Sequence, residues 1–398
     1  MIKENFMEKL LDGVEVEWKA IWEVTIWDKK FNAVSREKQP KVINYSYLLA
    51  ADLFNLEQYE GDVFLLSTGE RIGWTTEELA GDYIRTGEVV TIPWGKSRPL
   101  KDVIKYYKGR FVTADNRIAT SNNTDKLLNK FLYYWLLNQS IIIDGFYRGS
   151  GIQHPNMASV LDMEIPIPPL QVQQEIVRIL DTFTELTAEL TAELTARKKQ
   201  YNYYRDKLLS FEDGEVEWKT LGDLATIGTG SRNTNEAVED GKYQFFVRSQ
   251  IPRRINEYEY DETAIITAGD GVGVGKVFHY VTGKYGLHQR AYRIVVNDIE
   301  IINSKFLYYF FINNFYNYII KTSVHASVTS LRKPMFEKYS IPIPPLEEQQ
   351  RIVSILDKFE VLITSITEGL PREIELRQKQ YEYYRDMLLN FPKDDVEV

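Results

Sequence analysis

A long internal repeat constrains this chain more than any other feature. The proline-rich segment Ile165-Pro-Ile-Pro-Pro-Leu170 returns as Ile341-Pro-Ile-Pro-Pro-Leu346, and the run at 200–209 returns almost unchanged at 380–389. A self-match of this length is a property of architecture and not of chance. The sequence therefore predicts two copies of one structural unit.

Each copy begins with prolines and continues as a helix. The hexapeptide lacks the amide hydrogens that a helix or a central strand needs, which predicts an extended connector that ends the preceding element. The next segment places apolar residues at alternating steps of three and four, which is the stripe of a helix that packs on another helix. In the first copy these residues are Ile176, Ile179, Phe183, Leu186 and Leu190. We expect the two long helices to form an antiparallel coiled coil.

A shorter repeat lies inside the first helix. Leu186-Thr-Ala-Glu is followed by Leu190-Thr-Ala-Glu and by Leu194-Thr-Ala. A four-residue step does not match a heptad, so the apolar stripe drifts around the helix. Each unit adds about 6 Å of length and about 40° of rotation, which is close to the roughly 35° by which one base pair turns in B-DNA. A repeat of this kind is suited to act as a ruler.

The order of these features predicts the domain organisation. Glu-Val-Glu-Trp-Lys at 15–19 matches 215–219, so the repeating unit is a globular block, a proline connector and a long helix. We expect an α+β fold with two globular mixed α/β domains, separated by two long helices, and an approximate two-fold internal repeat. The expected limits are 1–164 for the first domain with a short N-terminal helix, 165–211 for its connector and helix, 212–345 for the second domain, and 346–398 for the second connector and helix.

Both globular blocks mix strand and helix signals. Strands are expected at Val89–Trp94, Tyr107–Thr113, Ala264–Thr267, Lys276–Val281 and Ala291–Val296, and helices at 130–138 and 305–313. Elsewhere the two blocks differ freely, which suits two domains that read different sequences. The second long helix contains Gly369-Leu-Pro371, so we expect it to break there.

Composition excludes several classes of protein. With no cysteine, disulfides and thiolate metal sites are excluded, and a cytoplasmic protein is the simplest interpretation. No apolar run approaches 18 residues, so we expect no membrane contact. The net charge is −9, but acidic residues concentrate in the helical segments, whereas the globular blocks are close to neutral. An acidic total therefore does not exclude DNA binding by basic loops.

Three catalytic patterns are incomplete. The glycine-rich run Gly269–Lys276 lacks the spacing of a phosphate-binding loop, so a turn-rich strand connection is favoured. Glu17-Trp-Lys19 with Asp12, and the equivalent Glu217-Trp-Lys219 with Asp213, imitate part of a nuclease metal site, but each tryptophan is expected to pack its block onto its helix. The 4 histidines lack metal-ligand spacing, and no methyltransferase motif of the Asn-Pro-Pro-Tyr type is present. We expect no catalytic residue and no metal in this chain.

The repeated connectors, the Leu-Thr-Ala-Glu units and the motif Gln-Tyr-x-Tyr-Tyr-Arg-Asp together resemble the specificity subunit of type I restriction-modification systems, and the tetrapeptide repeat resembles its IC class. The resemblance covers essentially the whole chain. It implies two target recognition domains that each read one half of a bipartite site in double-stranded DNA. It also implies that the helices fix the distance between the half sites and that each helical region docks a methyltransferase subunit.

The resemblance places the cofactors on partner proteins. Two methyltransferase subunits are expected to bring S-adenosylmethionine, and restriction subunits are expected to use ATP and Mg²⁺ in the full complex. The aromatic helix ends, Tyr201 and Tyr204 with their counterparts Tyr381 and Tyr384, are candidates for partner contact.

Loop residues that can bridge a base edge or hold a phosphate are the candidates for DNA contact. In the first domain they are Lys29, Lys30, Lys96, Arg98, Asn116, Arg117 and Arg148. In the second domain they are Arg232, Asn233, Arg248, Gln250, Arg253, Arg254, His288, Gln289, Arg290, Ser327, Arg332 and Lys333. For each single residue, an ordinary solvated surface side chain is an equally good interpretation.

Two other functions are open to this sequence. A coiled-coil scaffold would bind only protein and would show no salt-dependent affinity for duplex DNA, which a DNA reader must show. A nuclease that uses the two Glu-x-Lys pairs would lose its activity when Lys19 and Lys219 are both changed, and would still bind DNA.

Overall fold

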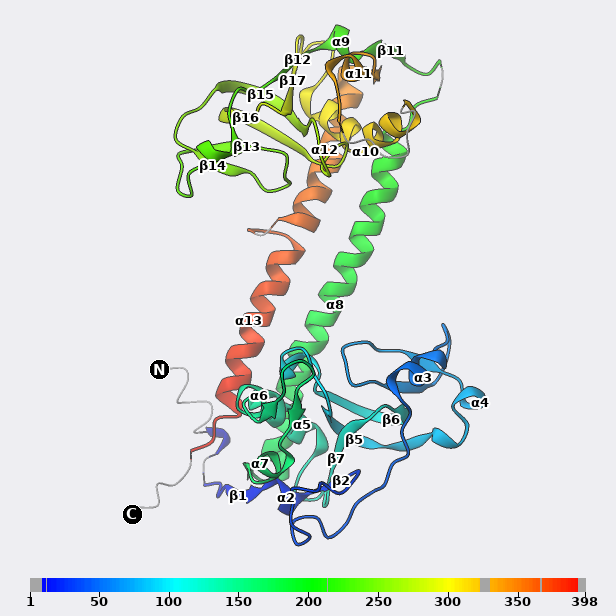
Figure 1. The fold of residues 1–398 in the computed structure, drawn as a ribbon, viewed down its shortest axis with the longest axis vertical. Coiled ribbons are helices and arrows are strands. Elements are labelled where there is room, and N and C mark those ends of the chain that lie inside the picture. The colour runs from blue at the N-terminus through cyan, green and yellow to red at the C-terminus, as the bar shows by residue number, and fades with distance from the viewer. Residues whose placement is uncertain (1–8, 12, 213, 323–329, 366, 393–398) are drawn as a thin grey trace. The chain divides into compact units, whose positions relative to one another are not determined.

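The chain folds into two compact units, which a computed structural model describes over residues 9–11, 13–212, 214–322, 330–365 and 367–392. The first unit comprises residues 1–189 and 375–398, and the second comprises 190–374. Each unit has a mixed sheet with helices packed on it and a pair of long helix segments (Figure 1). The expected α+β fold is confirmed. The domain limits at 164, 211 and 345 stay a prediction, because each unit takes in a globular block together with parts of the long helices.

The first globular block and its long helix have these elements: β1 (Glu17–Ala20), α2 (Ile21–Val24), β2 (Thr25–Trp27), α3 (Ala50–Asn55), β3 (Val63–Leu66), β4 (Trp74–Thr75), α4 (Glu77–Ala80), η1 (Gly81–Tyr83), β5 (Arg85–Pro93), η2 (Leu100–Asp102), β6 (Lys105–Thr113), β7 (Asn116–Ser121), α5 (Asn129–Asn138), α6 (Ser140–Asp144), β8 (Tyr147–Arg148), β9 (His154–Pro155), α7 (Met157–Leu161), β10 (Glu164–Ile167) and α8 (Leu170–Leu208).

The second block and its helices have the same plan: β11 (Glu217–Thr220), α9 (Leu221–Leu224), β12 (Ala225–Thr229), η3 (Thr234–Glu236), β13 (Tyr243–Phe246), β14 (Arg253–Ile255), β15 (Tyr260–Ala268), β16 (Phe278–Leu287), β17 (Ala291–Val296), α10 (Ser304–Thr322), α11 (Lys333–Glu337), β18 (Ser340–Ile343), α12 (Leu346–Thr364) and α13 (Leu370–Leu388).

The two sheets have one topology. The first runs in the order β2-β7-β5-β6-β3-β4, and the second runs in the order β12-β17-β15-β16-β13-β14. In both, a single parallel pair, β3 with β6 and β13 with β16, lies among antiparallel neighbours. Helix α5 packs on the first sheet and α10 on the second, and the largest apolar clusters fill these interfaces. The internal repeat is thus confirmed at the level of strand order and register.

The proline connectors are extended, as expected, but they also pair. Strand β10 pairs antiparallel with β1, where Pro166 lies opposite Trp18, and β18 pairs in the same register with β11. A two-stranded ribbon leaves one edge of each strand unpaired, so a proline costs no ladder hydrogen bond there. Trp218 packs edge-to-face at 6.4 Å on Phe310 of α10, a helix of its own block. The expectation that Trp18 and Trp218 pack their blocks onto the long helices stays a prediction.

The long helices pair within each unit. In the first unit, α8 and α13 run antiparallel, and Phe183 stacks on Tyr384 with ring centroids 5.1 Å apart (Figure 1). In the second unit, the later part of α8 packs on α12, where Tyr201 and Tyr204 contact the ring of Phe359 at 6.2 and 6.0 Å. Both pairs have the apolar and aromatic contacts that the stripe of the first helix predicts.

The break in the second helix is confirmed. Helix α12 ends at Thr364, and α13 begins at Leu370. Gly369 adopts a φ of +87°, and a Cβ atom at this position would lie 2.6 Å from the carbonyl oxygen of Val361. Only glycine fits this turn without strain. Among the helices in the described ranges, none combines the length and the apolar character that a membrane span requires.

Each block is fastened to its long helix by the same two contacts. Gln173 on α8 is fully buried; its Oε1 accepts from the amide of Leu128 at 2.9 Å, and its Nε2 donates to the carbonyls of Lys126 and Pro168 at 2.7 Å each. Gln349 on α12 makes the matching bonds in the second unit. The other contact joins a helix of the block to the long helix: Tyr134 of α5 donates to Asp181. Its counterpart, Tyr309 of α10, donates to Asp357.

Candidate nucleic-acid interface

One end of the second sheet gathers charged residues from three loops. Asp270, in the loop after β15, accepts hydrogen bonds from two guanidinium groups: Arg248 Nη1 lies 2.7 Å from its Oδ1, and Arg290 Nη1 lies 3.0 Å from its Oδ2. Arg248 comes after β13, and Arg290 stands directly before β17. The strand order brings these loops together although they are far apart in the sequence.

A pair of amide side chains involves Gln289, the residue before Arg290. Gln289 Nε2 donates to Asn233 Oδ1 at 2.6 Å, and both side chains are exposed. The backbone amide of Gln289 donates to the carbonyl of Arg232 at 3.0 Å. The guanidinium of Arg232 forms ion pairs with Glu236 and Glu257, each at 3.1 Å. The loop after β12 thus joins the same end of the sheet.

Hydrogen bonds and burial fix this end of the second domain. The amide of Arg290 donates to His288 Nδ1 at 3.0 Å, and the amide of Gly269 donates to the carbonyl of Arg290 at 2.8 Å. His288 is 5% exposed, and burial, with the nearby Arg248 charge, lowers its pKa, so the neutral ring accepts at Nδ1. Burial alone would raise the pKa of Asp270, but the hydrogen bonds from its two arginines outweigh burial and lower it.

The segment before α11 reaches the same place. Ser330 forms a β-bridge with Asp270, and Arg332 and Lys333 come next with exposed side chains. Ser327 lies outside the described residues. This end of the sheet therefore brings together most of the candidates that the sequence suggests for the second domain.

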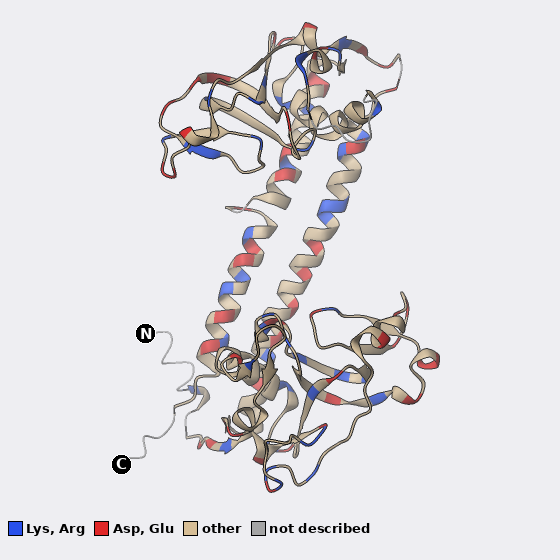
Figure 2. Cartoon of the chain, viewed as in Figure 1, with Lys and Arg blue, Asp and Glu red and all other residues tan. Residues whose placement is uncertain are grey.

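Three further candidates of this domain belong to the β13–β14 hairpin. Gln250 is exposed in the hairpin loop, and Arg253 and Arg254 form the basic edge strand β14, which Figure 2 shows in blue. Arg254 Nε donates to the carbonyl of Gly241 at 2.8 Å, which holds the hairpin to the preceding loop. These arginines make no contact with the Asp270 cluster among the hydrogen bonds of the described residues.

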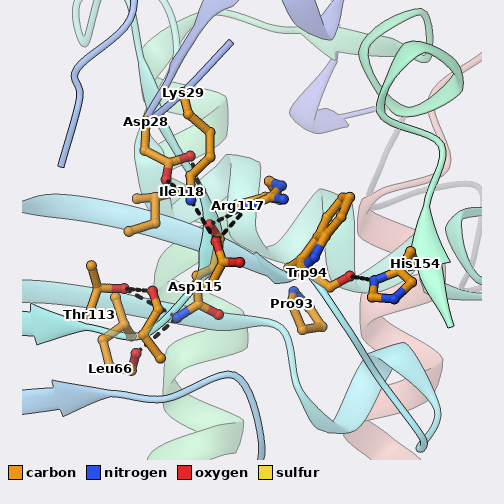
Figure 3. A network of polar contacts seen from close by, with 12 residues as sticks. Asp28, Lys29, Leu66, Pro93, Trp94, Thr113, Asp115, Arg117, Ile118 and His154 are labelled. Carbon is orange, nitrogen blue, oxygen red and sulfur yellow. Dashed lines mark hydrogen bonds and ion pairs between the residues drawn. The ribbon is translucent and has the colours of Figure 1, made fainter. Parts of the chain in front are cut away.

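The first domain carries a different polar network at the same end of its sheet. Asp115, directly before β7, lies between Lys29 at 2.6 Å and Arg117 at 2.9 Å (Figure 3). The guanidinium of Arg117 lies over the ring of Trp94, with 3.9 Å from Cζ to the ring centroid. Burial alone would raise the pKa of Asp115, but its bonds to Lys29 and Arg117 lower it.

Burial argues against a DNA contact for three candidates of the first domain. Arg117 is 6% exposed and is held by Asp115 and Trp94. Asn116 is 1% exposed, and its Nδ2 donates to the carbonyl of Leu66 at 2.9 Å. Lys96 is 8% exposed and forms an ion pair with Asp144 at 2.7 Å. The sequence shows the residue types but not their burial, and the structure gives these three a part in holding loops in place.

The remaining candidates of the first domain are accessible to a ligand. Lys30 and Arg148 are exposed, Lys29 is partly exposed, and Arg98 is exposed and pairs with Glu70 at 2.5 Å. Their contact with DNA stays a prediction.

A cleft of about 660 Å³ opens between the β3–β4 loop and the β5–β6 loop, and Arg71, which the sequence pattern does not single out, lines it with Arg98. Lys105 is a second residue that the pattern misses: it donates to Ser67 Oγ at 2.6 Å and to the carbonyls of Ser67 and Arg71, which orders the β3–β4 loop. A lysine at the start of a strand gives no sequence signal of such a contact.

The four tyrosines of the aromatic helix ends differ in exposure. Tyr381 is 7% exposed, and Tyr201 is partly buried against Phe359. Tyr204 and Tyr384 keep 39% and 37% exposure, but each stacks on a ring of the paired helix. Tyr381 therefore has little surface left for a partner, and partner contact by the other three tyrosines stays a prediction.

The Glu-x-Lys pairs are ion pairs on the β1 and β11 strands. Glu17 lies 2.7 Å from Lys19, and Glu217 lies 3.6 Å from Lys219. Asp12 and Asp213 lie outside the described residues. Within the described part of the chain, no three His, Asp or Glu side chains gather as metal ligands would.

Comparison with known proteins identifies the family. The family of the type I restriction modification DNA specificity domain matches residues 42–197 and again residues 214–376. A type I restriction enzyme specificity subunit of Escherichia coli is 35% identical over 100% of this chain and 99% of its own length. A putative type I restriction enzyme specificity subunit of Haemophilus influenzae is 34% identical over 97% of this chain and 98% of its own length.

Solved structures agree on the fold. The crystal structure of the type I restriction-modification S subunit from M. genitalium superposes with a TM-score of 0.62 at 17% identity, over 96% of this chain and 98% of that one. A chain from a structural study of complex assembly in the type I restriction-modification system superposes with a TM-score of 0.54 at 15% identity, over 94% and 97% of the two chains. Two matched family domains, two full-length relatives and one repeated fold lead to one conclusion: this chain belongs to the family of type I restriction-modification DNA specificity subunits.

Proposed function

We propose that this chain reads a bipartite site in double-stranded DNA, with one half site for each globular domain. The observation that carries the proposal is that the two domains share one sheet topology but have different charged residues at an equivalent loop position. Strands β7 and β17 occupy the same position in their sheets, yet Asp115 stands directly before β7 and Arg290 directly before β17. Base edges are recognised by the donors and acceptors presented to them. Two domains with one fold and opposite charges at one loop are therefore suited to different half sites.

Helix α8 sets the distance between the half sites in this proposal. The two Leu-Thr-Ala-Glu units at 186–193 lie within the continuous helix α8 (Leu170–Leu208), so removal of one unit shortens the helix by about 6 Å and rotates its C-terminal part by about 40°. The corresponding change along B-DNA is roughly one to two base pairs, since one pair turns by about 35°. The spacer of the target is therefore encoded by helix length.

Catalysis belongs to partner subunits in this proposal. Two methyltransferase subunits dock on the helical regions and supply S-adenosylmethionine, and restriction subunits supply ATP- and Mg²⁺-dependent cleavage. This chain contributes recognition and assembly and has no catalytic residue. The cytoplasmic location and the IC class stay predictions.

The proposal is tested by methylome sequencing of a host that expresses this chain with its cognate methyltransferase subunit. We expect a methylated motif of two short halves and a fixed spacer. Deletion of residues 190–193, one Leu-Thr-Ala-Glu unit, is expected to shorten the spacer and leave both halves unchanged. A stable complex that methylates no motif would contradict the DNA-reading function and favour the protein scaffold.

Salt dependence separates the same two functions in vitro. A DNA reader neutralises phosphates with lysine and arginine, so the logarithm of its affinity falls linearly with the logarithm of salt concentration. A protein-only scaffold has no such slope. Binding of the complex to a duplex that carries the motif is therefore measured between about 50 and 200 mM salt, where several phosphate contacts change the affinity by orders of magnitude.

A further inference from the structure

The loop before β17 holds one arginine in an unusual way. The backbone of Arg290 is fixed on both sides, by the hydrogen bond from its amide to His288 and by the bond from Gly269 to its carbonyl. Its side chain is 62% exposed, and one nitrogen, Nη1, is held 3.0 Å from Asp270 Oδ2. A long flexible side chain is thus anchored at its base and near its tip while the tip faces solvent.

The anchored side chain keeps a free recognition edge. Asp270 engages Nη1, and among the hydrogen bonds of the described residues none uses Nε or Nη2 of Arg290. A guanidinium edge with two parallel N–H groups matches the O6 and N7 acceptors of guanine. Arg248 shares the same carboxylate but is less exposed, at 41%, so it is the weaker candidate for a base contact.

Resting on the proposed function, we propose that Arg290 reads a guanine in the half site of the second domain and that Asp270 is the residue that positions it. The bond to Asp270 restricts the guanidinium before DNA binds, so less conformational entropy is lost when it contacts the base. This improves discrimination. It also neutralises part of the local positive charge, so that non-specific attraction to phosphates is reduced.

The residue directly before the equivalent strand differs between the two domains, although the sheet topology is the same. In the first domain this residue is Asp115, and its carboxylate is occupied by Lys29 and Arg117. The Asp115 network is closed on itself, whereas the Asp270 network leaves Arg290 with an open edge. The inference therefore applies to one half site only.

The test compares R290K and R290A with the unchanged chain, each in complex with its cognate methyltransferase and each read by methylome sequencing. Lysine keeps the charge for a phosphate contact but cannot form the bidentate base contact. We expect both variants to lose discrimination at one G·C pair of one half, by roughly 10- to 100-fold, while the other half and the spacer are unchanged. K338A, which removes one positive charge at the end of α11, a helix that packs on α9 and β12, is the control and is expected to keep the motif.

D270N tests the positioning part. The inference predicts that D270N raises the affinity for unrelated duplex, because a negative charge near the DNA is lost, and weakens discrimination at the same G·C pair. A merely structural aspartate would lower stability without raising non-specific affinity. If the unchanged chain methylates a bipartite motif and both R290A and R290K keep the same motif, the role of Arg290 is overturned and the proposed function stands. A complex of the unchanged chain that methylates no bipartite motif overturns the proposed function and this inference together.

Discussion

The hydroxyl of Tyr134 on α5 donates to Asp181 Oδ1 on α8 over 2.7 Å, and this bond is one of the contacts that tie the first globular block to its long helix. Tyr134 is 2% exposed, and burial together with the Asp181 carboxylate raises its pKa, so the hydroxyl keeps its proton and remains a donor. Lys130 adds an ion pair to the same carboxylate at 2.8 Å. The block and helix are therefore expected to unfold together.

Y134F removes this bond and leaves the partly exposed Asp181 carboxylate with fewer partners. A hydrogen bond to a charged group contributes about 1.5 to 3 kcal/mol, so we expect the free energy of unfolding to fall by about that amount in denaturant titrations. Y59F changes a fully exposed tyrosine in the same unit and is expected to have no measurable effect. Equal stability of both variants would show that the Tyr134 bond does not fasten the block.

Gln173 provides a sharper test of the same junction. Its side-chain amide is fully buried, accepts a hydrogen bond from one backbone N–H and donates to two backbone carbonyls. Q173E buries a carboxylate and leaves two carbonyls without a donor, so we expect a loss of about 3 kcal/mol or more. The neighbouring Q174E makes the same chemical change at an exposed position and is the matched control. A thermal melt that shifts equally for both variants contradicts this role of Gln173.

Arg117 and Arg98 separate a structural arginine from an accessible one. R117A removes a buried guanidinium from its partly buried ion pair with Asp115 and from its contact with Trp94, and a hydrogen bond to a charged group contributes about 1.5 to 3 kcal/mol. R98A removes an exposed side chain and is expected to change stability by no more than about 0.5 kcal/mol. We expect R98A to weaken DNA binding without unfolding the domain. Denaturant titration and a salt-titrated binding assay on both variants check this split.

Lys105 makes stability depend on pH. Burial lowers its pKa to about 8, whereas an unfolded lysine titrates near about 10.4. Between these values the unfolded chain holds a proton that the folded chain has released, so the contribution of this group to stability rises with pH. K105M removes the titration. The difference in unfolding free energy between the unchanged chain and K105M should therefore grow in favour of the unchanged chain from pH 7.5 to 10, and a constant difference would contradict the pKa shift.

Local pattern predicted much of the fold. The repeat predicted two equivalent units, the turn at Gly369 predicted the break between α12 and α13, and the strand expected at Ala291–Val296 matches β17 residue for residue. Pattern was less informative for the connectors, because pairing of β10 with β1 joins residues about 150 positions apart along the chain. Trp218 shows the same limit: its packing partner Phe310 lies in a helix that periodicity identifies but does not place.

The sequence by itself determined the repeat, the long helices, the fold class and the family resemblance, because these depend on local periodicity and on self-similarity. Only the tertiary structure decided which polar loop residues are accessible. Asn116 and Arg117 read as DNA contacts in the sequence, yet the sheet buries both, whereas Arg290 stays exposed beside a carboxylate from another loop. The physical reason is that burial and ion pairing arise from strands brought together across the chain, which no local pattern specifies.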